Sequence, residues 1–148
     1  MSENTFTHNS INVNPLHKIT IVAARWNAEL VDDLVHAASE HLTKIGYKNI
    51  ETIYVPGSWE LVHASQKALE KSDGVISFGV VIRGETTHYE LVTTETFRSI
   101  GNLAMDYPQI SVINNVICVE NENQLKERLF NTENNTKSLI KLIHEKSS

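Results

Sequence analysis

Apolar residues follow two different periods along this chain. Four short runs rich in β-branched residues lie at residues 18–26, 49–55, 73–82 and 110–119, and their length and composition predict strands. After the first run, Val31, Leu34, Val35 and Ala38 recur at steps of three and four, which predicts an amphipathic helix that ends at Gly46. By the same criterion we expect helices at about residues 31–45, 59–71, 88–105, 122–130 and 136–145, the last two separated by the polar run 131–135.

The predicted order of elements is therefore βαβαβαβαα. Strict alternation of strands and helices predicts parallel strands joined by right-handed crossovers. We expect an α/β fold: a flavodoxin-like three-layer sandwich in which helices cover both faces of a four-stranded parallel sheet. The third and fourth runs are nearly continuous in apolar residues and suit strands that are buried on both faces.

A single domain accounts for most of the chain. Its 148 residues, 41% of them apolar and 21% charged, match an ordinary globular domain, which we expect to span residues 15–148. Residues 1–14 are rich in Ser, Asn and Thr and are expected to form a flexible tail or a strand lent to a neighbouring subunit.

Charge and cysteine content exclude several classes of partner. The net charge of −5 offers no basic surface for nucleic acid or an anionic membrane. No apolar run reaches the roughly 18 residues needed to span a bilayer, and the polar N-terminal segment is unlike a signal peptide. Cys118 is the one cysteine, so no internal disulfide can form and a cytoplasmic location is expected.

Ligands of open parallel sheets bind where the carboxyl ends of the strands lead into helices. Three segments satisfy that rule, and the one after the third predicted strand is the most informative. Gly84 permits a tight turn, and the amides of Glu85, Thr86 and Thr87 would open a helix whose positive end attracts phosphate or another anion. His88 would lie beside the bound group, where an imidazole can transfer protons near pH 7. The alternative is an ordinary loop with a threonine cap and a surface histidine.

The segments after the first two predicted strands each carry a tryptophan beside a polar residue. Trp26 precedes Asn27, and Trp59 precedes Glu60. An aromatic face with hydrogen-bonding neighbours suits a planar heterocycle, although either tryptophan could instead pack in the core. No histidine or cysteine pair has metal-ligand spacing, so no metal site is expected.

Taken together, the three segments resemble one enzyme family. Ala-Arg-Trp-Asn at 24–27, Val-Pro-Gly-Ser-Trp-Glu at 55–60 and Gly-x-Val-Ile-Arg-Gly-x-Thr-x-His at 79–88 are similar, in order and spacing, to the 6,7-dimethyl-8-ribityllumazine synthases, which perform the penultimate step of riboflavin biosynthesis. The match runs from about residue 18 to residue 128.

The resemblance implies a transferase reaction that uses no cofactor and no metal. In that family 5-amino-6-ribitylamino-pyrimidinedione condenses with 3,4-dihydroxy-2-butanone 4-phosphate through an imine. Phosphate and water leave as the ring closes to the lumazine. Each step requires proton movement and no redox carrier.

The resemblance also implies roles for individual residues. Trp26 would stack on the pyrimidine ring with Asn27 close by, and His88 would move protons. Ser58, through its backbone, and Trp59 and Glu60 would bind the pyrimidinedione edge and the ribityl chain. Val81 and Ile82 would line the ring, and Glu85 and Thr86 would bind the phosphate.

The family forms homopentamers or multiples of pentamers, with active sites between subunits, so a neighbouring subunit is expected to contribute. Arg128 matches the arginine that reaches across to the phosphate, and Lys137 matches a family lysine if one residue is inserted. Asn114 stands where relatives carry an aromatic residue. These departures leave open a catalytically weak relative that binds lumazines or flavins, and the fold alone would also suit a flavodoxin-like electron carrier.

Overall fold

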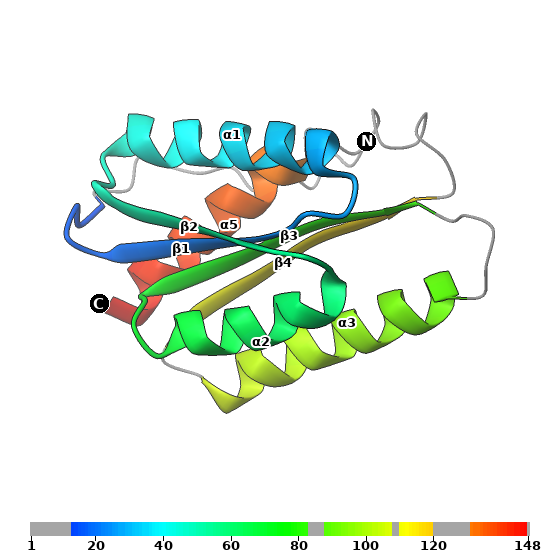
Figure 1. Ribbon diagram of the computed structural model, residues 1–148. Coiled ribbons are helices and arrows are strands. Elements are labelled where there is room, and N and C mark those ends of the chain that lie inside the picture. The colour runs from blue at the N-terminus through cyan, green and yellow to red at the C-terminus, as the bar shows by residue number, and fades with distance from the viewer. Residues whose placement is uncertain (1–12, 83–87, 108–109, 120–130, 148) are drawn as a thin grey trace, which may run out of the picture.

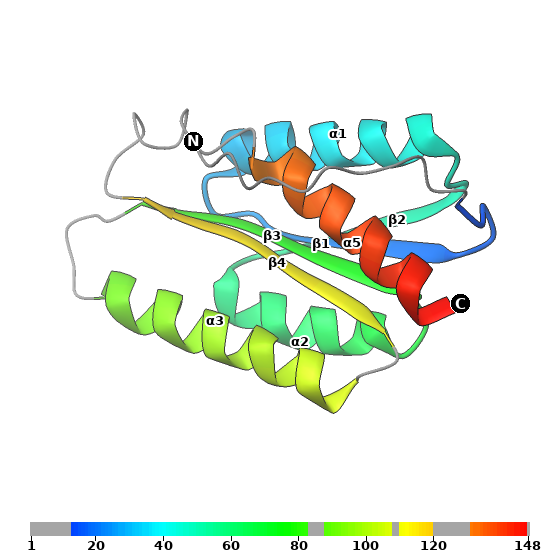
Figure 2. The same cartoon turned by 180° about the vertical axis from the view of Figure 1, so that it is seen from behind.

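The computed structural model describes residues 13–82, 88–107, 110–119 and 131–147 (Figure 1). Its sheet has four strands in the order β2-β1-β3-β4. All of them are parallel, as predicted. The strands are β1 (Lys18–Ala24), β2 (Asn49–Val55), β3 (Gly74–Ile82) and β4 (Ser111–Val119). The helices are α1 (Ala28–Ile45), α2 (Ser58–Leu69), α3 (His88–Asp106) and α5 (Asn131–Ser147). Helices α1 and α5 cover one face and α2 and α3 the other (Figures 1 and 2), so the predicted three-layer sandwich is confirmed.

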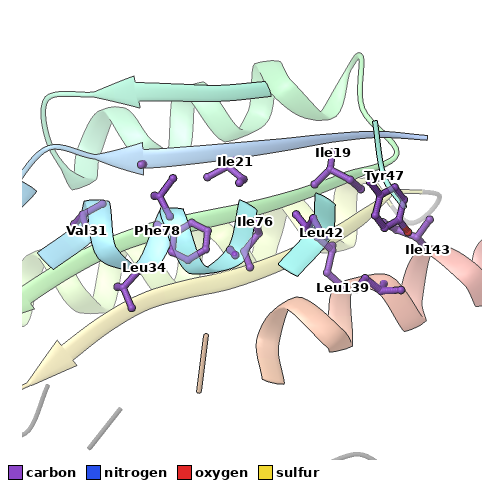
Figure 3. Packing of buried hydrophobic residues seen from close by; sticks show 14 of the residues in the cluster. Ile19, Ile21, Val31, Leu34, Leu42, Tyr47, Ile76, Phe78, Leu139 and Ile143 are labelled. Carbon is purple, nitrogen blue, oxygen red and sulfur yellow. The ribbon is translucent and has the colours of Figure 1, made fainter. Parts of the chain in front are cut away.

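Side chains alternate between the two faces of the sheet and form two apolar clusters. On the face toward α1 and α5, Ile21, Ile76 and Phe78 pack against Leu34 and Leu139, all of them buried (Figure 3). On the face toward α2 and α3, the cluster includes Val22, Leu61, Leu69, Val75 and Ile100. Two buried clusters on one sheet explain why the central strands have almost no polar positions.

The two strands predicted to be buried on both faces differ in exposure. Strand β3 is buried from Gly74 to Val81, as expected for a strand with neighbours on both sides. Strand β4 lies at the edge of the sheet, and its Val112 and Ile113 are only half-buried. Strand β4 therefore carries apolar side chains that this single chain does not fully bury.

The boundaries of α1 follow from its two caps. The helix begins at Ala28, before the first periodic apolar residue, because the carbonyl of Asn27 accepts the N–H groups of Leu30 and Val31. Gly46 ends it, as predicted, with φ of 120°, a conformation that glycine adopts without steric cost.

The prediction for the last part of the chain was wrong in one respect. The polar run 131–135 was expected to separate two helices, but it forms the first turn of α5. Asn and Thr side chains are favoured at helix N-termini, where they satisfy unpaired N–H groups, so a polar run need not be a loop. The predicted helix 122–130 lies outside the described residues.

Of the predicted N-terminal tail, the described part is Val13 and Asn14. Val13 packs against the cluster under α1 and α5, and Asn14 accepts a hydrogen bond from the N–H of Leu16 through Oδ1 at 2.9 Å. Across the part of the chain that the structure describes, no helix is long and apolar enough to cross a membrane.

Candidate active site

The carboxyl ends of all four strands meet at one edge of the sheet because the strands are parallel (Figure 1). At this edge β1 leads into α1 and β2 leads into α2, while α3 begins at His88 beyond the end of β3. The connections from β1 and from β3 run outward in opposite directions, since β2 and β4 are the edge strands. The carboxyl ends of the neighbouring strands β1 and β3 therefore mark the topological switch point, where doubly wound folds bind ligands.

Trp26 lies at the switch point, in the turn between β1 and α1. Its side chain is 62% exposed, so the core-packing alternative left open by the sequence is wrong for Trp26. An exposed indole at this place has an aromatic face free to stack on a planar ring.

Arg25, which precedes Trp26, is held by β2 and α1. Its backbone N–H donates to the carbonyl of Val55 at 2.7 Å. Its guanidinium lies 4.8 Å from the centre of the Tyr54 ring, and Nη1 is 2.6 Å from Oδ1 of Asp32. Tyr54 was not predicted from the sequence, although an aromatic residue at the carboxyl end of the expected strand 49–55 is a recognisable signal.

Asn27, which follows Trp26, is held by β3. The backbone has φ of 55° and ψ of 50°, the left-handed region that asparagine tolerates better than most residues. Its side-chain Nδ2 donates to the carbonyl of Val80 at 2.8 Å. The sequence gave no indication of this hydrogen-bond partner.

The second segment forms the start of α2. Gly57 is the N-cap with extended backbone, and Ser58 and Trp59 are the first two residues of the helix. Glu60 is exposed, and its Oε2 would lie 3.2 Å from a Cβ built on Gly57. The carboxylate thus folds back toward the start of the helix, whose positive end stabilises it.

The third segment is only partly described. Val81 is 9% exposed and belongs to the cluster under α2 and α3, whereas Ile82 is half-buried and packs against the opposite cluster. His88 is the first residue of α3, which confirms that a helix opens there. Glu85 and Thr86 lie outside the described residues.

Two of the three residues expected from a neighbouring subunit, Asn114 and Lys137, lie in the described part of the chain. Asn114 pairs with Ser77 midway along β4, and Lys137 is half-buried in α5. Arg128 lies outside the described residues. Among the residues that are described, no three His, Cys, Asp or Glu side chains come together as a metal site would require.

The described part of this edge therefore combines an exposed indole, the end of a buried strand and the N-terminus of a helix with a carboxylate beside it. The indole can stack on a flat ring, while backbone groups and the carboxylate can bind its polar substituents. Such an arrangement suits a planar heterocycle that carries amide and hydroxyl groups.

Comparison with known proteins gives a consistent result. The sequence model of a family described as "6,7-dimethyl-8-ribityllumazine synthase" matches residues 17–145. A 6,7-dimethyl-8-ribityllumazine synthase of Polaromonas sp. is 39% identical over 114 residues, which cover 74% of this chain and 73% of that protein. The proteins of the same name from Neisseria gonorrhoeae and Campylobacter jejuni are 39% identical (76% of this chain, 73% of the relative) and 36% identical (80% and 79%), respectively.

Proposed function

The chain belongs to the 6,7-dimethyl-8-ribityllumazine synthase family, and from that membership we propose how its residues carry out the family's reaction. The protein is an enzyme of riboflavin biosynthesis. It condenses 5-amino-6-ribitylamino-pyrimidinedione with 3,4-dihydroxy-2-butanone 4-phosphate to 6,7-dimethyl-8-ribityllumazine, and it releases phosphate and water.

The exposure of Trp26 at the switch point is the observation that carries the assignment of the ring site. Trp26 is 62% exposed, and the residues on either side of it are held by hydrogen bonds, so a flat ring can stack on the indole without a rearrangement of the turn. Stacking removes the apolar face of the indole from water. The pyrimidinedione stacks on this indole and lies toward the end of β3. There Ile82 lines the ring, and Val81, whose side chain is in the core cluster, contributes its backbone.

The polar edge of the pyrimidinedione and the ribityl hydroxyls bind at the start of α2. The backbone of Ser58 and the side chains of Trp59 and Glu60 make these contacts. The position of the Glu60 carboxylate beside Gly57 supports this role, because a carboxylate held at a helix N-terminus is an oriented acceptor for N–H and O–H donors.

The phosphate of the second substrate binds where the chain enters α3. Glu85, through its backbone amide, and Thr86 hold the phosphate near the positive end of that helix. His88, the first residue of α3, moves protons as the imine forms, phosphate leaves and the ring closes. A guanidinium from Arg128 of a neighbouring subunit completes the phosphate site. Asn114 and Lys137 of that neighbour also contribute to the substrate site.

A homo-oligomer, a pentamer or a multiple of pentamers, is the functional unit in this proposal, and its location is the cytoplasm. Two observations support association. Strand β4 is an edge strand with half-buried Val112 and Ile113, and α3 exposes Phe97 and Met105 by 45% and 79%. Apolar side chains left open on two elements are typical of a surface that a partner covers.

The test is to mix the purified protein with both substrates and follow the lumazine chromophore. We expect a rate well above that of the uncatalysed condensation. His88→Ala should slow turnover, at most by the roughly 10²- to 10⁴-fold that general acid–base catalysis supplies, with little change in pyrimidine binding. His36→Ala, an exposed histidine paired with Glu40 on α1, is the matched control. A wild-type rate equal to the uncatalysed one would exclude the proposed activity.

A further inference from the structure

The place of the Trp26 indole is determined by the residues on either side of it. With 62% of its surface exposed, Trp26 gains little positional restraint from packing within its own chain. Its orientation depends instead on the backbone of the turn between β1 and α1. On one side of this turn, Arg25 is held by a backbone hydrogen bond to β2 and an ion pair with α1. On the other side, Asn27 is held by a hydrogen bond to β3.

Strands β1 and β3 separate just before the site. Their pairing ends with Ala23 opposite Phe78, and the N–H of Arg25 then follows β2 by donating to Val55. The side chain of Asn27 returns to β3 at Val80, with Nδ2 2.8 Å from the carbonyl oxygen. One side-chain amide therefore spans the opening between the two strands at the switch point.

Asn27 is also suited to this link by its backbone. It is the one non-glycine residue with positive φ in the part of the chain that the structure describes, and asparagine occupies this conformation at lower cost than most residues. Its carbonyl starts α1 by accepting two N–H groups. The same residue thus sets the turn, the start of the helix and the distance from the turn to β3.

We propose that Asn27 is a positioning residue, which fixes the Trp26 indole relative to the end of β3 by hydrogen-bonding the carbonyl of Val80. The proposed ring site lies between the Trp26 indole, which follows β1, and the end of β3. The hydrogen bond from Asn27 to Val80 determines the distance between these two sides. The inference rests on the proposed function for the identity of the ring that fills the gap. The hydrogen bond itself does not depend on which ring that is.

Two variants remove the link in different ways. Asn27→Gly keeps the left-handed backbone accessible and deletes the amide. Asn27→Asp keeps the size of the side chain, but a carboxylate cannot donate to the carbonyl of Val80. For both we expect KM for the pyrimidinedione to rise about three- to tenfold, the range that one lost hydrogen bond accounts for, with a smaller change in KM for the butanone phosphate. Glu29→Gln, an exposed residue of the first turn of α1, is the control and should behave as wild type.

A second readout separates positioning from direct contact with substrate. The chain has two tryptophans, so Trp59→Phe leaves Trp26 as the one indole. In that background, Asn27→Gly and Asn27→Asp should lower the fluorescence anisotropy of the ligand-free protein, because the indole gains freedom, whereas Glu29→Gln should not.

Lower anisotropy with raised KM supports the proposal. Lower anisotropy with unchanged KM overturns it, because the ring site would then not depend on the hydrogen bond from Asn27. Raised KM with unchanged ligand-free anisotropy means that Asn27 binds substrate directly and overturns it, as does no change in either quantity. If the wild-type protein forms no lumazine, the proposed function fails and the anisotropy still decides the role of Asn27. If Asn27→Gly does not fold, Asn27→Asp gives the answer.

Discussion

Gly74 of β3 lies so close to Ile143 of α5 that a Cβ built on Gly74 would be 2.6 Å from Cδ1 of Ile143. Leu139 Cδ1 would be 3.2 Å away. Both side chains are buried, with 3% and 0% of their surface exposed, so they have little room to rotate away in a close-packed interior. Because glycine has no side chain, position 74 allows α5 to pack directly on the start of β3.

Gly74→Ala should destabilise the protein. The added methyl group must displace Ile143 within the buried cluster, and overpacking of this kind typically costs about 1–3 kcal/mol of the free energy of unfolding. Urea unfolding measures this loss, provided that all variants are compared at one protomer concentration, because association contributes to apparent stability.

Gly79→Ala is the matched control on the same strand. The nearest atoms to a Cβ at position 79 belong to Val116 and Ala24 at 3.6 and 3.7 Å, which is ordinary van der Waals contact. We expect the free energy of unfolding to stay the same or rise slightly, since alanine lowers the entropy of the unfolded chain. Equal losses for both variants would show that the contact with α5 is not the cause.

Trp26→Ala should weaken binding of the pyrimidinedione and leave the fold intact. The lost stacking corresponds to roughly a tenfold or greater increase in KM for that substrate. Because the indole is 62% exposed, the free energy of unfolding should change by no more than about 0.5 kcal/mol. Trp26→Phe keeps an aromatic face and should retain most of the affinity. Unchanged KM for Trp26→Ala would contradict the stacking role.

Phe97→Asp should disrupt the proposed homo-oligomer. Phe97 and Met105 lie eight residues apart on α3 and therefore on the same side of the helix. In the proposed assembly, a carboxylate at position 97 would place a charge in the contact between subunits, which is costly without a partner. Light scattering should show a lower mass for this variant than for wild type. Ala37→Asp, an exposed position on α1, which covers the opposite face of the sheet, should keep the wild-type mass; a monomeric wild type would contradict the proposed assembly.

The strands could be predicted from sequence because burial on both faces of a parallel sheet leaves a strong apolar pattern. The expected run at residues 49–55 coincides with β2, and the other runs differ from their strands by one or two residues. Helix starts were harder. The start of α1 depends on the backbone of Asn27, which periodicity does not report, and the start of α5 is a polar turn whose residues resemble a loop.

The candidate site was predictable as a set of segments but not as a geometry. The sequence identified Trp26 and left its exposure open, because a tryptophan after a strand occurs both in cores and in binding sites. The hydrogen bond from Asn27 to Val80 joins residues 53 positions apart and exists because β1 stops pairing with β3 before β3 ends. No local pattern encodes such a relationship.

Tyr47 should limit the stability of the protein in alkaline solution. Tyr47 follows the cap of α1 and is 3% exposed, beside Ile143 (Figure 3). Burial raises the pKa of its phenol above the ordinary value of 10.0, and the nearby carboxylate of Asp73 raises the pKa further. Both effects disfavour the phenolate in the folded state.

The sign of the effect follows from proton linkage. The unfolded chain releases the Tyr47 proton near pH 10, while the folded protein retains it to higher pH, so the contribution of Tyr47 to stability is complete below about pH 10 and is lost as the pH rises toward the folded pKa. Urea unfolding at about pH 8 and about pH 10.5 should therefore show a larger drop for wild type than for Tyr47→Phe, because the other titrating groups are common to both. Asp73→Asn should reduce the extra drop without abolishing it, since burial is the larger cause. Parallel pH dependence of wild type and Tyr47→Phe would mean that the buried phenol does not limit stability in base.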